Sequence, residues 1–358
     1  MKIVHLLTYY GDYIGGIQIY VKELAKRQKA LGNNVKIITS SLYGKEKEVE
    51  GIKVIKSPVL FSAFRIPFTP ILPYHLFIEK IDVLHVHLPS PWIDLCSVLK
   101  KIISPNTKLV ITIHNYLPFA DTFPKKIFSF VHDKIFIKLA LKFADEVTTC
   151  SEGFAKSLPY KINDKKLNII PYGLDLNKFK SLNLKKKNQI LFVGRLIPEK
   201  GLLELVKAVK SIPKLKRLRV LAIVSETYKY SKYKEECLKE GKDFLEIKAN
   251  VPNEGIINYY NESKVFVFPS LGIDSFGIVL IEAMACGLPV VCTNLPGPSS
   301  IVPSYAGVIV NPKNKKELMK AIEKVLNGNY DSNQIEEYVK ENFDYETITK
   351  KILEVYKT

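Results

Sequence analysis

The stretch 264–297, KVFVFPSLGIDSFGIVLIEAMACGLPVVCTNLPG, constrains the fold of this 358-residue sequence more than any other part. It predicts a buried strand at 264–270, a loop at 271–277, a helix at 278–286 and a second strand at 290–293. A strand, a loop, a helix and a strand in this order form the repeating unit of a parallel sheet. We therefore expect an α/β protein.

The loop 271–277 has the chemistry of an anion-binding turn. It ends at a helix N-terminus, where backbone N–H groups lack helical partners and the helix dipole is positive. Gly277 allows a ligand to approach the backbone closely. Asp274 fits two roles, a helix cap or a ligand group. Glu282 is surrounded by apolar residues and needs a polar partner, which a sugar hydroxyl or a ribose would supply.

The motif D-S-F-G-I-V-L-I-E-A-M-A-C-G-L-P-V-V at 274–291 resembles the signature of the retaining family 4 glycosyltransferases. That signature has two acidic residues eight positions apart, in E-x-F-G-[IL]-x-x-x-E-A-M-A-x-G-x-P-V-V. Asp274 stands here where the family usually has Glu. The resemblance implies an α/β GT-B fold, with two Rossmann-like domains facing an interdomain cleft. It also implies retaining transfer of a hexose from a nucleotide-sugar donor to a glycan, a lipid-linked acceptor or another hydroxyl acceptor.

The resemblance covers nearly the whole chain and implies its domain organisation. An acceptor-binding domain is expected at 1–172 and a nucleotide-sugar-binding domain at 173–340. A C-terminal helix at 341–358 is expected to pack back on the first domain. Between the domains, YGLDLNKF at 172–179 resembles the family motif N-G-V-D-x-x-x-F, with Tyr172 in place of the usual Asn.

A pair of glycines follows the first predicted strand, at 2–7, and precedes a helix at 17–31. Two glycines alone indicate a tight turn more readily than a phosphate-binding loop. The family has a Gly-Gly pair at this point, which lets the backbone approach the donor diphosphate and the reacting sugar. The resemblance therefore assigns that role to Gly15 and Gly16.

Three candidate histidines lie on the strands predicted at 82–87 and 108–114 of the first domain. His85 and His87 share one face of the strand at 82–87, and because no third ligand is evident we favour a structural role over a metal site. His114 ends the strand at 108–114, and active sites of open parallel sheets lie at the carboxyl ends of strands. The family has a histidine here that lies against the donor sugar, which implies the same role for His114.

Two basic residues flank a turn in the second domain, within VGRLIPEKG at 193–201. Two solvated surface charges would be the ordinary explanation for them. The match to the family motif G-R-L-x-x-x-K-G implies instead that Arg195 and Lys200 neutralise the departing diphosphate. With His114 and Asp274 they form the implied catalytic set. The implied donor contacts are Asp274 to sugar hydroxyls, Glu282 to the ribose, and the amides of Phe276, Gly277 and Ile278 to the diphosphate, with the nucleobase near 247–250.

The net charge of +17 fits nucleic acid, anionic lipid or anionic ligands as partners, and it fits a lysine-rich solvated surface equally well. The segment 124–144 predicts a helix with a lysine face, either an ordinary packed helix or a peripheral contact with anionic membrane.

The sequence has no run of about 18–20 apolar residues, and its five cysteines lack metal spacing, so we expect a cytoplasmic protein with reduced thiols. No Asp-x-Asp pair is placed for the diphosphate. We expect a UDP- or GDP-linked donor as substrate, with no cofactor and no metal in the chemical step.

Three other functions are compatible with parts of this pattern. A GT-B nucleotide-sugar epimerase or hydrolase would act on the donor without an acceptor. A dinucleotide-dependent oxidoreductase needs G-x-G-x-x-G after its first strand, and residues 11–16 lack it. A nucleic-acid-binding protein would use the positive charge, but the sequence contains no familiar binding module.

Overall fold

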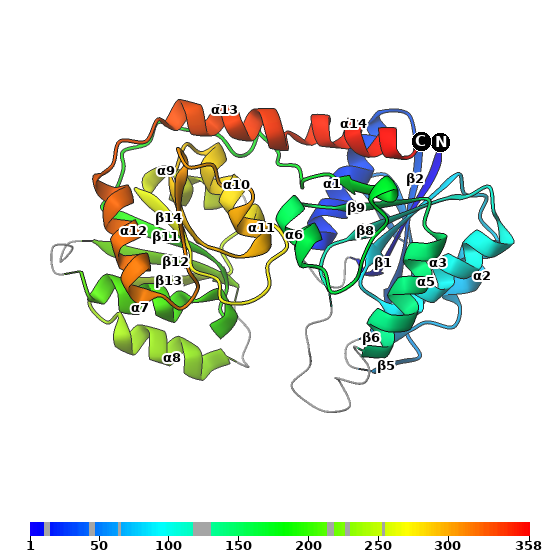
Figure 1. Ribbon diagram of the computed structural model, residues 1–358, viewed down its shortest axis with the longest axis horizontal. Helices are drawn as coiled ribbons and strands as arrows, with labels where there is room; N and C mark the ends of the chain where they lie inside the picture. The colour runs from blue at the N-terminus through cyan, green and yellow to red at the C-terminus, as the bar shows by residue number, and fades with distance from the viewer. Residues whose placement is uncertain are drawn as a thin grey trace. The chain divides into compact units, whose positions relative to one another are not determined.

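The computed structural model describes residues 1–10, 15–42, 47–63, 66–116, 130–212, 218–225, 230–252 and 255–358. The chain divides into two compact units (Figure 1). The first unit is Met1–Gly173 together with Tyr345–Thr358, and the second is Leu174–Asp344. In each unit, helices cover both faces of a sheet (Figure 1). The expectation of an α/β protein is confirmed.

The sheet of the first unit has eight strands among the described residues, in the order β10-β9-β8-β7-β1-β2-β4-β3. All neighbours are parallel except β3 and β4. Every residue of the central strand β7 is buried, as in sheets covered on both faces. A separate hairpin pairs β5 (Phe61–Ala63) with β6 (Ile66–Phe68). The sheet strands are β1 (Lys2–Tyr9), β2 (Asn34–Ser41), β3 (Lys47–Val49), β4 (Ile52–Pro58), β7 (Val83–Leu88), β8 (Lys108–Ile113), β9 (Glu146–Thr149) and β10 (Leu167–Ile169).

The C-terminal helix α14 (Tyr345–Val355) packs on α1 (Gly16–Ala30) within the first unit. There the Arg27 guanidinium lies 4.3 Å from the centre of the Tyr345 ring, a cation–π contact. The described residues of this unit also form the α-helices α2 (Leu72–Phe77), α3 (Pro91–Ile103), α5 (Ile137–Phe143) and α6 (Glu152–Ser157) and the 3₁₀ turn η2 (Asp164–Lys166).

The helix expected at 124–144 is only partly described. Residues 124–129 lie outside the described part of the chain. The remainder is helical, but a π-helical turn, η1 (His132–Phe136), precedes α5. The 3.6-residue period predicted a regular α-helix here, and this detail was wrong.

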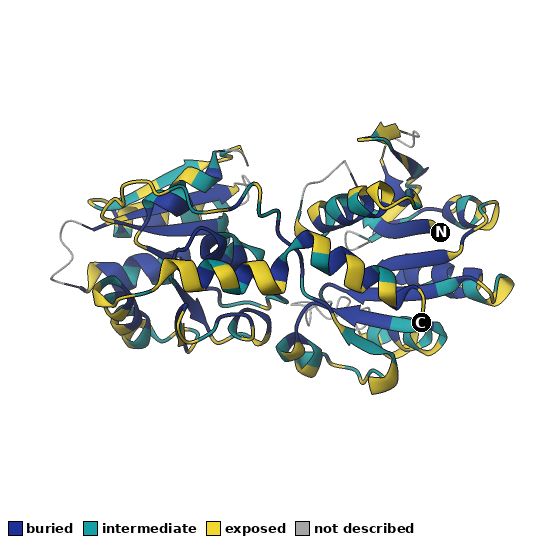
Figure 2. Ribbon diagram, turned by 90° about the horizontal axis from the view of Figure 1, so that it is seen from above, coloured by how far each residue is buried: buried dark blue, intermediate teal, exposed yellow. Residues whose placement is uncertain are grey.

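The second unit has a six-stranded parallel sheet within its described residues, in the order β13-β12-β11-β14-β15-β16. The strands are β11 (Gln189–Arg195), β12 (Arg219–Ser225), β13 (Leu245–Ala249), β14 (Val265–Phe268), β15 (Val290–Thr293) and β16 (Gly307–Val310). The helices are η3 (Pro198–Lys200), α7 (Leu202–Lys210), α8 (Ser231–Glu240), α9 (Ile256–Glu262), α10 (Ile278–Ala285), α11 (Pro296–Ser299), α12 (Lys315–Asn327) and α13 (Ser332–Phe343). The strands and inner helix faces form the apolar core, and the outer helix faces are exposed (Figure 2).

The strand order of each sheet reverses at one place. In the first unit β1 lies between β2 and β7, and in the second β11 lies between β12 and β14. Ligands of open parallel sheets bind beyond the carboxyl ends of the strands at such a reversal. The loops that follow β11 and β14 are therefore the part of the second unit where a ligand is expected.

The C-terminal helix expected at 341–358 is α14, which begins only at Tyr345. Helix α13 ends at Phe343 and α14 begins at Tyr345, with Asp344 between them. The backbone N–H of Leu174 donates to the carbonyl oxygen of Phe343 at 2.7 Å within the second unit. The apolar pattern of both helices has the same period, so this pattern does not indicate the break.

Gly201 lies between η3 and α7 in a left-handed conformation, with φ of +74°. A Cβ at this position would overlap the carbonyl oxygen of Pro269, which follows β14. We predict that Gly201→Ala lowers the free energy of unfolding by about 3 kcal/mol, from backbone strain and overpacking together. Gly32→Ala is the matched control, because Gly32 has φ of +83° but no atom within 4 Å of the added Cβ. It should cost only about 1 kcal/mol. Equal losses for the two variants in urea unfolding would contradict the role of the close backbone contact.

Candidate active site

The loop between β14 and α10 fixes the position of Asp274. Gly277 precedes helix α10 in a left-handed conformation, with φ of +91°, and no side chain caps the helix. Asp274 is therefore not a helix cap, which was one of its two expected roles. Its Oδ1 accepts a hydrogen bond from Lys200 Nζ at 2.6 Å, and its Oδ2 accepts one from Ser270 Oγ at 2.5 Å. With both oxygens engaged, the carboxylate is held in one orientation.

Lys200 comes from the turn after β11, so its ion pair with Asp274 joins the two loops at the strand reversal. The two side chains are 16% and 17% exposed, which leaves both accessible to a ligand. The carbonyl oxygen of Glu199 strengthens the junction by accepting from Leu271 N at 2.7 Å and contacting Ser270 Oγ at 3.1 Å. The family resemblance assigned Lys200 to the diphosphate of the sugar donor and Asp274 to its sugar hydroxyls. In the structure the two side chains are in direct contact.

Arg195 is the last residue of β11 and is exposed at the carboxyl end of the sheet. It forms no ion pair with any residue in the described ranges, whereas Lys200 is paired with Asp274. The positive charge available to an incoming anion is therefore centred on the Arg195 guanidinium. Its planar fork of donors suits a phosphate group.

Glu282 lies half-buried on α10. Its Oε2 accepts a hydrogen bond from the hydroxyl of the buried Tyr260 at 2.7 Å. Burial raises the pKa of the Glu282 carboxyl, although this hydrogen bond and the charge of Lys178 act in the opposite direction. The carboxylate oxygens can accept further hydrogen bonds, which suits a ligand with hydroxyl groups.

The start of α10 presents backbone rather than side chains. The Phe276 side chain is buried, with its ring 5.8 Å from that of Phe343, so Phe276 can offer a ligand only its backbone. Gly277 and Ile278 follow at the helix N-terminus, where a Cβ on Gly277 would come within 2.9 Å of Leu280. The glycine therefore permits both the backbone conformation and the close packing of this turn.

The predicted glycine pair lies at the start of α1 in the first unit. Gly15 is the N-cap residue in an extended conformation, with φ of −147°, and Gly16 is the first helical residue. Residues 11–14, which precede the pair, lie outside the described residues. The pair thus lies at a helix N-terminus.

His114 follows β8 as predicted, but it is buried, with only 2% of its surface exposed. Its Nδ1 is 2.6 Å from the Tyr172 hydroxyl and its Nε2 is 2.9 Å from His87 Nδ1. Both ring nitrogens therefore have protein partners. A donor sugar could meet the ring only by exchanging with the Tyr172 hydroxyl.

The structure supplies the third histidine that the sequence did not reveal. His5 on β1 lies beside His85 and His87, and ligand atoms of the three lie within 4.8 Å of one another. However, His5 bonds to His87 and Gln28, while His85 bonds to the hydroxyls of Tyr356 and Thr112. Since every ring nitrogen of the three already has a hydrogen-bond partner, the cluster is organised as a polar core network.

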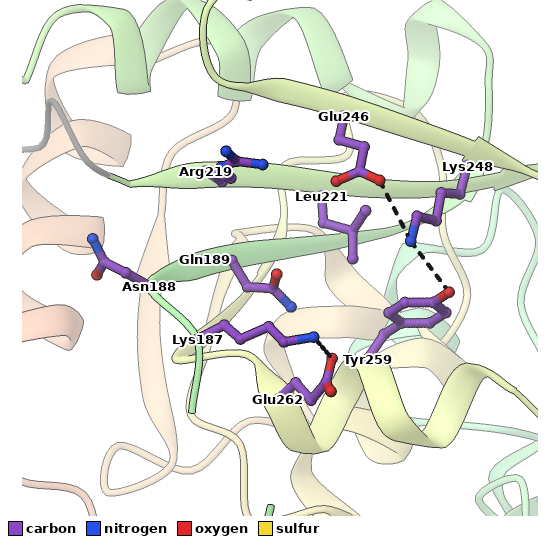
Figure 3. Close-up of a pocket in the computed structure, with 9 residues that line it drawn as sticks. All are labelled: Lys187, Asn188, Gln189, Arg219, Leu221, Glu246, Lys248, Tyr259 and Glu262. Carbon is purple, nitrogen blue, oxygen red and sulfur yellow. Dashed lines mark hydrogen bonds and ion pairs between the residues drawn. The ribbon is translucent and has the colours of Figure 1, made fainter. Parts of the chain in front are cut away.

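A different pocket lies at the other edge of the second sheet (Figure 3). It has a volume of about 380 Å³ and is lined near the amino ends of β11 and β12 by Gln189 and Arg219. Its other charged groups are paired, with Lys187 2.5 Å from Glu262 and Lys248 3.4 Å from Glu246. Its position away from the carboxyl ends of the strands does not favour it as the donor site.

The sequence did not predict which residues form hydrogen bonds to the predicted site residues. Ser270 holds Asp274, Tyr260 holds Glu282, and Gln28 and Tyr356 bond within the histidine network. Only Ser270 left a signal, because a hydroxyl four residues before an acid in a loop is a natural partner for it. The other contacts join elements far apart in the sequence.

Comparison with known proteins defines the class. The family profile described as Glycosyl transferases group 1 matches residues 175–342, and the profile described as Glycosyltransferase Family 4 matches residues 14–178. An uncharacterized glycosyltransferase of Methanocaldococcus jannaschii is 25% identical over 99% of this chain and 98% of its own length. A phosphatidylinositol N-acetylglucosaminyltransferase subunit of Arabidopsis thaliana is 23% identical over 91% of this chain and 74% of its own.

Solved structures show the same fold. The HepE protein of Anabaena in complex with UDP matches with a TM-score of 0.80, at 18% identity over 99% of both chains. A glycosyltransferase from Rickettsia africae ESF-5 matches with a TM-score of 0.79, at 21% identity over 99% of this chain and 97% of that one. These matches confirm the GT-B fold. The chain belongs to the group 1 glycosyltransferases of family 4. None of its described helices is both long and apolar enough to cross a membrane.

His5, His85, His87 and His114 form the histidine network of the first unit. Burial keeps these four side chains neutral. It lowers the pKa of His5 to about 4 and that of His114 to about 3. It also lowers the pKa values of His85 and His87 well below the ordinary value. His132 behaves in the opposite way: burial lowers its pKa, but hydrogen bonds to Asp133 and Asp94 outweigh burial and raise it to about 9.

We predict that the first unit loses stability as the pH falls from 6.5 towards 4. In this range the unfolded chain protonates His5 and His114 while the folded unit does not, so each lowers the free energy of unfolding by about 1.4 kcal/mol per pH unit. The contribution of His132 is already complete below pH 6.5 and does not offset this loss. Trp92, the only tryptophan, lies in the first unit and reports its unfolding in urea. An unchanged midpoint between pH 7 and pH 5 would contradict the neutral network.

Proposed function

We propose that this protein is a retaining hexosyltransferase that uses a UDP- or GDP-linked sugar as donor. The observation that carries the proposal is the ion pair between Lys200 and Asp274, beside the exposed Arg195, at the strand reversal of the second sheet. This arrangement places two cations, a carboxylate and a helix N-terminus at one edge of a sheet. A sugar attached to a diphosphate presents the complementary groups.

Each donor group has a partner of suitable chemistry in the second unit. Arg195 and Lys200, with the backbone amides of 276–278, would bind the diphosphate. Asp274 would accept hydrogen bonds from hydroxyls of the donor sugar, and Glu282 would accept those of the ribose. The nucleobase would lie near 247–250, at the end of β13, held mainly by backbone. In the first unit, Gly15, Gly16 and His114 are the residues we assign to the reacting sugar and diphosphate.

We propose the following chemical step for this arrangement. The bond between the anomeric carbon and the diphosphate oxygen breaks through an oxocarbenium-like state, and the acceptor hydroxyl attacks from the side of the leaving group. The departing phosphate takes the proton of that hydroxyl, so no protein base is required. Lys200 and Arg195 stabilise the charge that develops on the phosphate, and no metal takes part in this step.

Arg195→Ala should lower turnover by about 10²–10³-fold, because the exposed guanidinium stabilises charge that develops in the transition state. A panel of UDP-, GDP- and ADP-sugars, tested for thermal stabilisation of the protein, first identifies the donor. Turnover is then measured as release of the nucleoside diphosphate, with the anomeric configuration of the product read by proton NMR.

Arg219→Ala is the matched control for the arginine variant. Arg219 is an exposed arginine of the same unit, but it lies at the amino end of β12 in the pocket of Figure 3. Turnover should be close to that of the wild type in this variant. Near wild-type turnover in Arg195→Ala, or an equal loss in Arg219→Ala, would contradict the proposed clamp.

The acceptor that we propose is lipid-linked and lies at an anionic membrane surface. An apolar groove of about 310 Å³ in the first unit supports this. Phe68 and Trp92 pack at its centre with ring centroids 4.4 Å apart, and Phe136 of η1 also lines it.

A separate cavity beside η1 and α5 is lined by four lysines, Lys134, Lys138, Lys142 and Lys161. An apolar groove near a basic surface suits an anionic lipid. The name of the Arabidopsis relative describes transfer to a phosphatidylinositol, which agrees in chemistry with this proposal.

Vesicles containing anionic phosphatidylglycerol should bind the protein more tightly than vesicles of neutral phosphatidylcholine. Because Trp92 lines the groove and is the only tryptophan, its emission should shift to the blue when lipid fills the groove. Replacing Lys134, Lys138 and Lys142 with Glu should remove the preference for anionic lipid. Replacing Lys232, Lys234 and Lys239 of α8 with Glu makes the same change in charge and should leave the preference intact. Binding is measured by co-sedimentation of the protein with the vesicles. Equal amounts of protein sedimenting with both vesicle types would contradict the membrane proposal.

A further inference from the structure

A continuous chain of hydrogen bonds runs through the buried core of the first unit. It has eight links with distances between 2.5 and 3.0 Å. Every member is 7% exposed or less, and all four histidines use both ring nitrogens within the chain. In order, the members are Tyr172, His114, His87, His5, Gln28, Tyr356, His85, Thr112 and Thr148.

The Gln28 amide determines which atom donates in each of these hydrogen bonds. Its carbonyl Oε1 can only accept, so His5 must donate from Nε2. A neutral imidazole carries one N–H, which leaves His5 Nδ1 to accept from Nε2–H of His87. By the same reasoning His87 Nδ1 accepts from Nε2–H of His114. His114 Nδ1 is then an acceptor, and the Tyr172 hydroxyl donates to it.

The other branch has a consistent direction as well. Gln28 Nε2 donates to the Tyr356 oxygen, and the Tyr356 hydroxyl donates to His85 Nδ1. His85 then donates from Nε2 to Thr112. The Tyr172 and Tyr356 hydroxyls therefore both donate to imidazole nitrogens. This direction is favourable, because a phenol hydroxyl is a stronger hydrogen-bond donor than acceptor. Rotating the Gln28 amide by 180° would reverse every donor and make both phenols accept from the rings.

We propose that Gln28, His5 and His87 are positioning residues, which fix His114 as the Nε2–H tautomer and keep its Nδ1 as a hydrogen-bond acceptor. The consequence for catalysis rests on the role proposed above for His114. A substrate group that exchanges with the Tyr172 hydroxyl must then be a hydrogen-bond donor. A sugar hydroxyl meets this requirement, and an ionised phosphate oxygen does not.

The tautomers can be measured directly, without substrate. In protein labelled with ¹⁵N-histidine at pH 7, the imidazole nitrogen shifts distinguish the Nε2–H, Nδ1–H and doubly protonated forms. We expect His5, His85, His87 and His114 to be neutral Nε2–H forms. His132, which contacts Asp94 and Asp133 instead, provides the doubly protonated reference in the same spectrum. An Nδ1–H form, a metal-bound ring or an average of two forms at His5, His87 or His114 would overturn the proposal.

Two variants then separate the branches. Gln28→Leu removes the acceptor that pairs with His5 Nε2–H, and should change the His114 signals. It should also lower kcat by about 10–100-fold, by analogy with outer-shell groups that orient metal-bound histidines. Tyr356→Phe removes the hydroxyl on the other branch, and should change His85 while leaving the His114 tautomer unchanged. Unaltered His114 signals in Gln28→Leu would contradict the proposal.

These outcomes distinguish the proposal from the function on which it rests. Should Gln28→Leu fail to fold, the wild-type spectrum still decides, because it fixes the tautomers without any variant. If the wild type shows the expected tautomers but no sugar transfer with any donor, the proposed function fails and the network stands. If transfer occurs while His114 carries its proton on Nδ1, the network proposal fails and the proposed function stands.

Discussion

The ion pair between Lys200 and Asp274 is the contact on which the candidate site depends. It joins the loop after β11 to the loop after β14, at the point where the strand order of the second sheet reverses. Exposed ion pairs contribute little to stability, but these two side chains are only 16% and 17% exposed, and Ser270 completes the pair. Removing either partner would leave the other charge poorly compensated, so the pair orients both loops.

The first unit uses a different constraint, a buried polar core. Four neutral histidines, on β1 and β7 and directly after β8, form part of a single chain of hydrogen bonds. Buried polar groups destabilise a core unless each has a partner, and here every ring nitrogen has one. Tyr356, which follows α14, bonds to both Gln28 and His85. The end of the chain therefore completes the network in the middle of the first sheet.

Local patterns predicted the parts of the structure that depend on neighbouring residues. The strand–loop–helix–strand unit at 264–297 is confirmed as β14, α10 and β15, because apolar runs and glycine stops are local signals. Pairings across the fold were not predictable: nothing near His5 indicates His87, and nothing near Tyr260 indicates Glu282. The break at Asp344 was missed because the prediction relied on the apolar period, which is the same in α13 and α14.

A crystal structure of the protein with a bound nucleoside diphosphate sugar tests the central claim most directly. We expect diphosphate density against Arg195, Lys200 and the N-terminus of α10, with a sugar hydroxyl on Asp274. A nucleotide bound instead in the pocket beside Arg219 and Tyr259, with the loops after β11 and β14 empty of ligand, would contradict it.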